Sequence, residues 1–360
     1  MQAIKTWVER QLADTEMVAL MASLLVLFGL LALFGDTLAP VLVAIAMAYV
    51  LDGVMDLLGR CRVPRLISIF LVGAGAILFI LFTLLAVVPL LSEQVGRLVS
   101  QAPHYVSSLR DSLHTLQNQY ASWINPDYVQ RLASLVAGKL QEWGAAVFSF
   151  SLASIPGLIT LLVYVVLVPV LVFFLLKDKG VLITWGQQFL PRHRVLLSRV
   201  WSEVDIQIGN YIRGKFWEMF VVGVVTWLVL WWCGHQYAPL LGALTGISVW
   251  IPFVGAAVVT IPVVLLSFFQ WGISDATLYA LIAYGVVQAL DANLLVPWLF
   301  SEVVNIHPIA IIVAILVFGS LWGVLGIFIA IPMAALVQSV LQVMMGRKSS
   351  EVIAENVQEH

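Results

Sequence analysis

The chain has 360 residues, of which 61% are hydrophobic and 11% are charged, and its mean hydropathy is +1.00. A soluble domain usually carries about a quarter charged residues, so this chain has too few charges to coat a soluble particle of its size. The formal net charge of -2 excludes the basic surface of a nucleic-acid-binding protein. Two cysteines, Cys61 and Cys233, are too few for a disulfide scaffold or a cysteine-rich metal site. Composition therefore predicts an all-α polytopic membrane protein without metal, cofactor or nucleic acid.

The N-terminal region, residues 1–91, contains apolar runs at 17–34, 38–51 and 66–91. A bilayer core about 30 Å thick needs about 20 mostly apolar residues to be crossed by a helix. The first run follows a charged stretch and has no small-residue cleavage site after it, so we expect an uncleaved membrane helix instead of a signal peptide. Further spans are predicted at 152–176, 216–233 and 278–299, which makes about six full spans in all.

Two polar stretches interrupt the apolar sequence. Residues 92–150 carry apolar positions at helical spacing with polar residues between them, which predicts a small water-facing helical insertion. Residues 177–215 place Trp201, Ile208 and Tyr211 on one helical face beside several arginines, a pattern typical of an amphipathic helix at the membrane surface. This segment is either a helix packed at the interface or a lipid sensor. The domains predicted here are 1–91, 92–150, 151–176, 177–215, a transport core at 216–345, and a tail at 346–360.

The basic residues predict the orientation of the chain. Fourteen of the 18 lie in four groups: the N-terminal tail, 60–65, 177–215 and 347–348. The other four are spread through the insertion. Because lysine and arginine accumulate in cytoplasmic loops, we expect the four groups and both termini in the cytoplasm and the insertion on the far side. Cys61 and Cys233 then lie near opposite faces and cannot pair within one chain.

Two apolar stretches, 240–269 and 309–345, are too long for one crossing, and each is interrupted near its middle by proline or glycine. Short, interrupted hydrophobic segments in matching positions indicate a transporter binding site, because their freed backbone groups must meet protein or water. We therefore predict two re-entrant helical hairpins. The alternative is a pair of ordinary spans, one of them tilted and kinked. The matched positions are Trp250, Gly255 and Pro262 in the first stretch and Trp322, Gly326 and Pro332 in the second, with the breaks at Pro252 and Gly323.

Between the two hairpins lies a cluster of polar side chains inside an apolar run. Asp291 is an acid within a predicted span, and such a charge costs several kcal/mol unless it is paired or hydrated. Gln288 shares its helical face, Asn293 follows, and Pro297 removes a helical donor. We predict that these residues bind a solute or ion. The alternative is that Asp291 is protonated, or bonded to an Asn or Gln of a neighbouring helix, and only holds the bundle together.

Three further polar residues are candidates with two interpretations each. Asn305 and His307 precede the second hairpin, and His307 is either an interface histidine or a proton carrier. Glu218 either pairs locally with a neighbouring base or takes part in transport. Motifs of metalloproteases, nucleotide-binding loops and serine hydrolases are absent from the sequence, so we expect no enzyme, and transport energy would come from a gradient.

Several segments resemble the autoinducer-2 exporter family, and most of all its PerM-type permease branch. They are residues 167–179, 211–215, 250–255, 291–297, 305–308 and 321–326, and the resemblance extends from about residue 17 to residue 341. The resemblance implies a homo-oligomeric, pentameric transporter of the bacterial inner membrane whose two hairpins take part in an elevator-like movement. Its members export autoinducer-2 in some cases and are linked to sodium/proton exchange in others.

The resulting prediction is a secondary transporter that exports a small polar solute, such as an autoinducer-2-like molecule, across the inner membrane. A sodium/proton antiporter with Asp291 as ion ligand is the alternative within transport. The alternative from another class is a membrane scaffold that recruits an envelope partner through residues 92–150.

Overall fold

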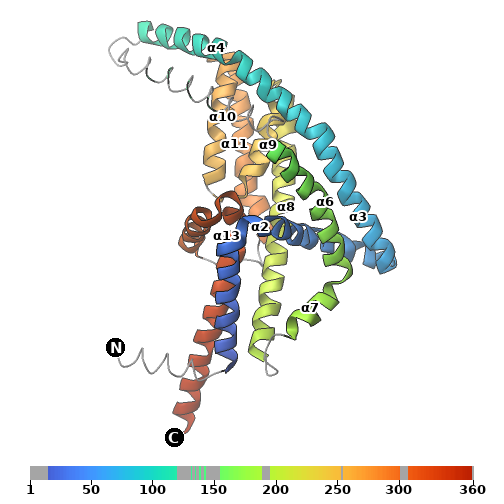
Figure 1. Cartoon of the computed structure of the whole chain (residues 1–360). Coiled ribbons are helices and arrows are strands. Elements are labelled where there is room, and N and C mark those ends of the chain that lie inside the picture. The colour runs from blue at the N-terminus through green and yellow to red at the C-terminus, as the bar shows by residue number, and fades with distance from the viewer. Residues whose placement is uncertain are drawn as a thin grey trace. The chain divides into compact units, whose positions relative to one another are not determined.

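The computed structural model describes residues 15–119, 155–188, 195–252, 254–300 and 307–358, together with residues 131, 134, 138 and 142. Every regular element in these ranges is helical, and the all-α membrane fold predicted from composition is confirmed (Figure 1). The chain divides into two compact units. Unit 1 comprises Met1–Gly73, Leu167–Phe216 and Leu299–His360, and unit 2 comprises Ala74–Val166 and Trp217–Trp298.

The helices distribute over these units as follows. Those wholly in unit 1 are α2 (Thr15–Arg60), α7 (Lys179–Gln187) and α13 (Pro308–Gln358). Those wholly in unit 2 are η1 (Thr83–Val87), α4 (Val88–Gln119), α9 (Ala238–Ser248), α10 (Val254–Trp271), α11 (Asp275–Leu290) and η2 (Asp291–Leu295). Four helices contribute residues to both units: α3 (Arg65–Phe82), α6 (Ile155–Lys177), α8 (Val195–Trp232) and α12 (Val296–Phe300).

Unit 1 is held together by apolar contacts among α2, α8 and α13. The α2 helix bends at Phe34, whose backbone angles (φ -125°, ψ 15°) are not helical (Figure 1). Phe28, before the bend, stacks on Phe318 of α13 with the ring centroids 6.1 Å apart. Val204 of α8 packs with Leu336 of α13 in the same core. These contacts fix the N-terminal arm of α2 against the C-terminal part of the chain.

Unit 2 has its core among α9, α10 and α11, with one side covered by α4. Leu241, Val263 and Ala280, one from each of the three helices, are fully buried in this core. Tyr105 of α4 stacks on Phe269 of α10 at 5.1 Å between ring centroids. The first part of the predicted 92–150 insertion is therefore helical, and it belongs to the core of unit 2.

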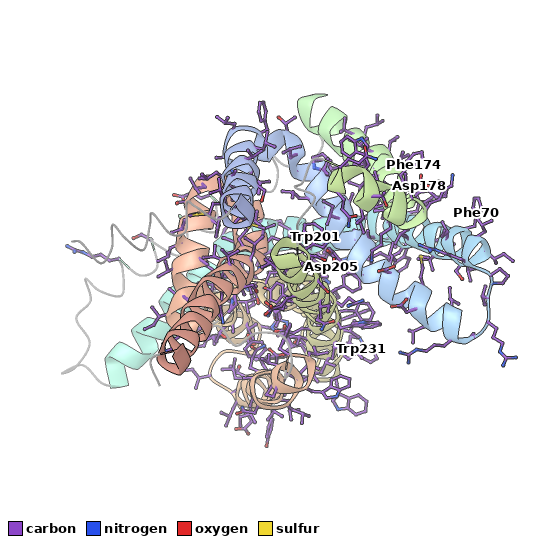
Figure 2. The ribbon with its side chains drawn as sticks, turned by 90° about the horizontal axis from the view of Figure 1, so that it is seen from below. Phe70, Phe174, Asp178, Trp201, Asp205 and Trp231 are labelled. Carbon is purple, nitrogen blue, oxygen red and sulfur yellow. The ribbon has the colours of Figure 1, made fainter. Side chains whose placement is uncertain are left out.

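Among the described residues, five helical segments are long and apolar enough to cross a membrane: Thr37–Arg60, Arg65–Gln101, Val200–Trp232, Val254–Trp271 and Asp275–Phe300. Many large apolar side chains on these helices and on α6 point outward, as Trp231 of α8, Phe70 of α3 and Phe174 of α6 show in Figure 2. Such a surface is stable against lipid and would be costly in water. Four of the six predicted spans coincide with these segments. The other two correspond to the shorter apolar helices Met21–Gly35 and Leu162–Lys177.

The α8 helix crosses a boundary that the sequence analysis places between residues 215 and 216. It runs without a break from Val195 to Trp232, across the boundary expected at 215/216. The polar residues near that boundary do not end the helix because they are buried: Lys215 is 6% exposed and Glu218 is 2% exposed. The part of the predicted 177–215 segment from Val195 onward and the following span are therefore one helix, whereas α7 is a separate helix.

Candidate transport site

The first predicted hairpin is present in unit 2 as α9 and α10, which pack against each other, and α10 also packs against α11 (Figure 1). The α9 arm has 11 residues and spans only about 16 Å, which is less than the hydrocarbon core. Trp250 and Pro252 lie in the turn between the arms, and the Trp250 indole donates to the sulfur of Met219 at 3.2 Å. Pro262 lies within α10, where it removes one helical hydrogen bond.

The second predicted hairpin is present in unit 1 within α13. Two apolar helices, Ile309–Gly323 and Gly326–Val340, meet at a break where Trp322 (φ -131°, ψ 16°) and Gly323 (φ 58°, ψ -132°) leave the helical region. The first arm, about 22 Å long, is again shorter than the hydrocarbon core, whereas the helix of the second arm continues beyond its apolar part to Gln358. Pro332 lies in the second arm, as Pro262 does in the first hairpin.

One glycine in each hairpin lets the two arms approach closely. A Cβ atom added to Gly255 would lie 1.8 Å from the carbonyl oxygen of Ser248, and one added to Gly326 would lie 1.8 Å from that of Phe318. Real Cβ atoms essentially never come within 3.0 Å of another heavy atom in this way. The matching glycines of the sequence pattern therefore have the same structural role in both hairpins.

A histidine precedes each hairpin and accepts a similar hydrogen bond. The Nδ1 atom of His235 accepts the backbone N–H of Tyr237 at 3.1 Å, and Nδ1 of His307 accepts that of Ile309 at 3.3 Å. The environments differ, because His235 is 3% exposed and packs against Trp271, whereas His307 is exposed. Burial disfavours the charged imidazole and lowers the pKa of His235 to about 4. Asn305 lies outside the described residues.

The predicted polar cluster lies in unit 2 at the junction of α11 and α12. Asp291 is the first residue of the π-helical turn η2, in which the Val296 N–H donates to the Asp291 carbonyl, five residues earlier. Its Oδ1 atom is enclosed by protein, as is the Nε2 atom of Gln288, which donates no hydrogen bond within the described residues. The Asn293 amide donates to the carbonyl of Ala289 at 2.8 Å. Single π-turns inside α-helices often occur at functional sites.

The α11–α12 cluster and the first hairpin belong to unit 2, and the second hairpin belongs to unit 1. Pro297 follows the π-turn and is exposed, as is Asn293. Gln288 and Asp291 lie three residues apart and share a helical face, as the sequence predicts. Because Gln288 Nε2 donates no hydrogen bond within the described residues, the two side chains are not held together through that group.

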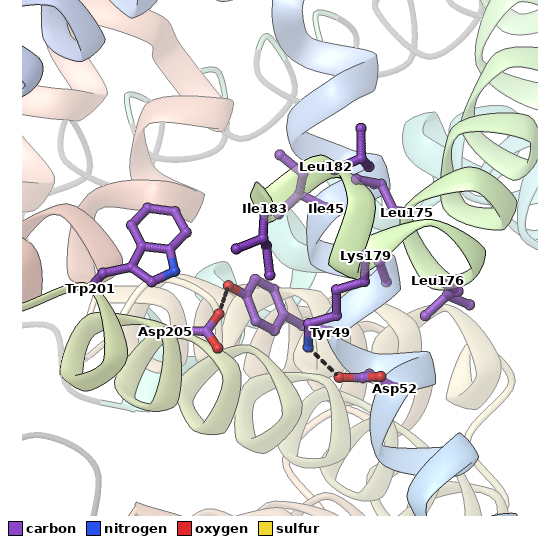
Figure 3. Close-up of a pocket in the computed structure, with 11 residues that line it drawn as sticks. Ile45, Tyr49, Asp52, Leu175, Leu176, Lys179, Leu182, Ile183, Trp201 and Asp205 are labelled. Carbon is purple, nitrogen blue, oxygen red and sulfur yellow. Dashed lines mark hydrogen bonds and ion pairs between the residues drawn. The ribbon is translucent and has the colours of Figure 1, made fainter. Parts of the chain in front are cut away.

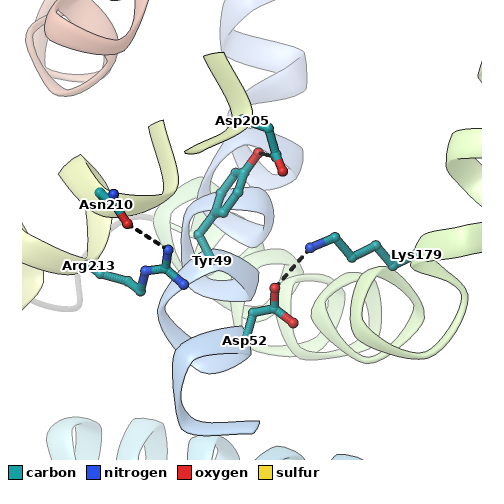
Figure 4. A network of polar contacts seen from close by, with 6 residues as sticks. All are labelled: Tyr49, Asp52, Lys179, Asp205, Asn210 and Arg213. Atoms are coloured by element: carbon teal, nitrogen blue, oxygen red, sulfur yellow. Dashed lines mark hydrogen bonds and ion pairs between the residues drawn. The ribbon is translucent and has the colours of Figure 1, made fainter. Parts of the chain in front are cut away.

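Unit 1 contains a polar network that the sequence analysis does not identify (Figure 4). The Tyr49 hydroxyl of α2 donates to Asp205 of α8, and Lys179 at the start of α7 forms an ion pair with Asp52 of α2 at 2.9 Å. Beside Tyr49, Arg213 donates to Asn210 at 3.0 Å on α8. The partners of the first two interactions are 156 and 127 residues apart in sequence. Two acidic residues are the sequence signals for this site. Asp52 follows an apolar run, and Asp205 lies one helical turn after Trp201.

The network borders a cavity of about 140 Å³ (Figure 3). Its apolar walls come from α2, α6 and α7, and its other walls come from Tyr49, Asp52, Lys179, Asp205 and Trp201. The cavity does not include any residue of the predicted transport site.

Comparisons with known proteins give the family of the chain. The profile of a family described as "AI-2E family transporter" matches residues 20–346. "Putative permease PerM" of Escherichia coli K12 is 40% identical over 95% of this chain and 97% of its own length. "Putative transport protein YueF" of Bacillus subtilis is 29% identical over 83% and 82% of the two chains. "AI-2 transport protein TqsA" of Escherichia coli K12 is 20% identical over 89% and 90%.

These matches cover nearly the whole chain, including both hairpins and the polar cluster between them, and the relatives are named as permeases or transport proteins. They confirm the resemblance identified from the sequence motifs. The chain belongs to the AI-2E transporter family.

Proposed function

We propose that this protein is a secondary transporter that exports a small polar solute across the bacterial inner membrane, with Asp291 in its solute or ion site. The observation that supports this most is the position of Asp291. An acid with an enclosed oxygen begins a π-helical turn inside an apolar helix. An ionisable side chain in such a segment is costly, and it usually serves an ion or solute pathway.

Gln288 strengthens this proposal because its amide nitrogen is also enclosed. A buried N–H donor without an acceptor destabilises the folded protein by about 1–3 kcal/mol. A bound polar solute would supply the acceptor that the Gln288 amide lacks. A solute with an acceptor oxygen could take a hydrogen bond from Gln288, and Asp291 could accept one or bind a cation. Both side chains are on the same face of α11, so one solute can reach both.

The hairpins contribute to the proposal through their rigidity. In each hairpin the close contact at Gly255 or Gly326 joins the two arms into one packed body. Such a body can move as a whole, which is what an elevator-like movement requires. We propose that the working form is a homo-oligomer, pentameric by family resemblance, with both termini in the cytoplasm.

The experiment that tests the proposal is solute flux by the purified protein in liposomes. The panel should contain autoinducer-2, polar metabolites of similar size and monovalent cations, each with an imposed sodium or proton gradient. We expect gradient-dependent movement of at least one polar solute. Absence of flux for the whole panel, with protein shown to be folded and inserted, would contradict the proposal.

A sodium/proton antiporter is the second candidate, and buried acids favour it. Glu218 is 2% exposed within the Val200–Trp232 segment, and Asp291 lies within Asp275–Phe300. Sodium-dependent proton flux that disappears in Asp291→Asn or Glu218→Gln would establish this activity.

The names of the relatives favour transport over the scaffold alternative. Replacing residues 120–150 by a short linker, which leaves the packed part of α4 in place, should preserve flux in a transporter and abolish function in a scaffold.

A further inference from the structure

The cavity of unit 1 has the features of a ligand site that is separate from the proposed transport site. Its volume is about 140 Å³, which leaves room for several water molecules or for a small organic group. Ile45 of α2, Leu175 of α6 and Leu182 and Ile183 of α7 form apolar walls. Water in such a space makes few hydrogen bonds, so a small apolar group gains free energy by displacing it.

The charges that line the cavity do not cancel. Asp52 and Asp205 carry two negative charges, and Lys179 carries the one positive charge among the lining residues. Lys179 is paired with Asp52. Asp205 accepts a hydrogen bond from the neutral Tyr49 hydroxyl, and within the described residues it has no ion pair. The cavity therefore presents one carboxylate whose charge is not balanced inside it, which favours a monovalent cation.

Arg213 is a base close to Tyr49, and it does not change this conclusion. It lies beside Tyr49, where it donates to Asn210, and it does not line the cavity (Figure 4). Within the part of the chain that the structure describes, Arg213 forms no ion pair with Asp205, and Figure 4 shows its guanidinium directed toward Asn210.

Aromatic side chains make the cation site specific for an organic cation. Trp201 precedes Asp205 by one helical turn on α8, so the two side chains lie on the same face (Figures 2 and 3). The Trp201 side chain is 62% exposed, which leaves its ring accessible, and it faces the same space as Asp205 and Tyr49. A cation over a tryptophan face gains about 0.5–2 kcal/mol. Carboxylate, indole and apolar walls together complement an ammonium group that carries a short carbon chain.

We propose that this cavity binds the ammonium group of a small amphipathic amine, with Asp205 as the counter-ion and Trp201 and the aliphatic walls in contact with its carbon chain. An anion of the same size would have to displace Asp52 from Lys179 and would face Asp205. The same ammonium chemistry has two sources: a soluble alkylamine, and the ethanolamine head group of a phospholipid. The lipid can reach the cavity because Asp52 and Trp201 lie toward the ends of the apolar helices Thr37–Arg60 and Val200–Trp232, and Lys179 follows the end of Leu162–Lys177.

The first experiment uses n-butylammonium as the probe, with butyrate and butanol as its anionic and neutral counterparts. Saturation-transfer NMR on the purified full chain in a detergent without amines measures the three affinities. We expect butylammonium to bind at least tenfold more tightly than either counterpart. Asp205→Asn should weaken butylammonium binding about tenfold or more. Trp201→Leu should weaken it several-fold. Equal binding of the three probes, or butylammonium binding that survives both substitutions, would overturn the proposal.

Matched controls keep the experiment decisive. Asp56 lies one turn after Asp52 on α2, and Trp185 is exposed on α7, but neither lines the cavity. Asp56→Asn and Trp185→Leu should therefore leave binding unchanged. Trp201 is largely exposed, so Trp201→Leu remains an informative variant even if Asp205→Asn fails to fold.

A second experiment distinguishes the two sources. Native mass spectrometry of the protein, released from vesicles of equal phosphatidylethanolamine and phosphatidylglycerol, counts the retained lipids. Retention of phosphatidylethanolamine that is lost in Asp205→Asn identifies the lipid head group as the ligand. Binding of butylammonium without such retention identifies a soluble amine. Absence of both would overturn the proposal, and because neither measurement uses flux, this result is independent of whether the protein transports a solute.

Discussion

The two broken hairpins have the same sequence pattern and the same close glycine contact, but their turns and their surroundings differ. In the first, residues 249–253 separate α9 from α10. In the second, the break occurs at Trp322 and Gly323, and Gly323 has a positive φ of 58°. The first begins after a buried histidine and the second after an exposed one. The comparison shows that a close contact between the arms is the common requirement, whereas the turn and the anchoring of the open end can vary.

We expect the largest loss of stability from substitutions of the glycine at the contact between the arms. Gly255→Ala and Gly326→Ala each place a methyl group 1.8 Å from a backbone oxygen, which cannot move without separating the arms. We expect each to destabilise the protein by about 3 kcal/mol or more, seen as aggregation or a large fall in the Tm of the purified protein. Gly285→Ala is the control, because a Cβ there meets nothing within 4 Å, and its Tm should be unchanged or higher. Tolerance of alanine in either hairpin would show that its arms are not packed as described.

The second hairpin differs from the first in the backbone conformation of its turn. Among the described turn residues, Gly323 alone has a positive φ, a conformation that favours glycine. Its angles (φ 58°, ψ -132°) are strained for any residue with a Cβ, although the space around it is open. Gly323→Ala should therefore cost about 1–3 kcal/mol, less than the substitutions at the arm contact. Thermal unfolding of the two sets of variants checks this order. A larger loss for Gly323→Ala than for Gly326→Ala would reverse it.

The two histidines predict a difference in pH dependence. Because burial lowers the pKa of His235 to about 4, the folded protein binds fewer protons than the unfolded chain between that value and the unfolded pKa near 6.5. Its stabilising effect is complete above about pH 6.5 and is lost as the pH falls, with about 2 kcal/mol gone by about pH 5.

The measurement for this prediction is Tm against pH for the protein and for His235→Gln and His307→Gln. We expect the fall in Tm between about pH 6.5 and 5, of a few degrees, to become smaller in His235→Gln and to remain in His307→Gln. An identical fall in all three proteins would show that other groups cause it.

The smallest predicted effect concerns the tryptophans of the two turns. The Trp250 indole donates to the Met219 sulfur, whereas Nε1 of Trp322 is buried and has no acceptor among the described residues. Trp250→Phe removes a weak hydrogen bond. Trp322→Phe removes a donor that is not used, so it should cost less than Trp250→Phe, with both changes within about 1.5 kcal/mol. Chemical denaturation of the two variants measures the difference, and the opposite order would indicate that Trp322 has a partner in solution.

The sequence predicts the breaks of both hairpins because Pro252 and Gly323 act on the backbone locally. It also predicts the shared face of Gln288 and Asp291, which follows from helical periodicity alone. The Gly255 and Gly326 contacts are only partly predictable, since a glycine in an apolar run does not reveal which carbonyl it approaches. The continuity of α8 across residues 215 and 216 is missed because Lys215 and Glu218 mark a polar boundary in sequence but are buried in the structure.

The amine cavity could not be predicted from sequence for a different reason. Tyr49 and Asp205 come from helices 156 residues apart, and only the packing of unit 1 brings them together. An isolated Asp52 at the end of an apolar run is an ordinary feature of a membrane helix. Its partner Lys179 is equally ordinary after such a run. Their function as the wall of a cavity depends on tertiary contacts that carry no local signal.

The most direct test of the proposed transport function is the flux of Asp291→Asn beside that of Asp275→Asn. Asparagine preserves the size of Asp291 and most of its hydrogen bonding, so only its charge and proton are lost. Asp275 is exposed in the first turn of α11, and its substitution serves as the control. With a solute that the native protein moves, we predict a loss of flux of at least about tenfold in Asp291→Asn, with normal assembly, and little change in Asp275→Asn. Normal flux in a well-folded Asp291→Asn protein would contradict the central claim.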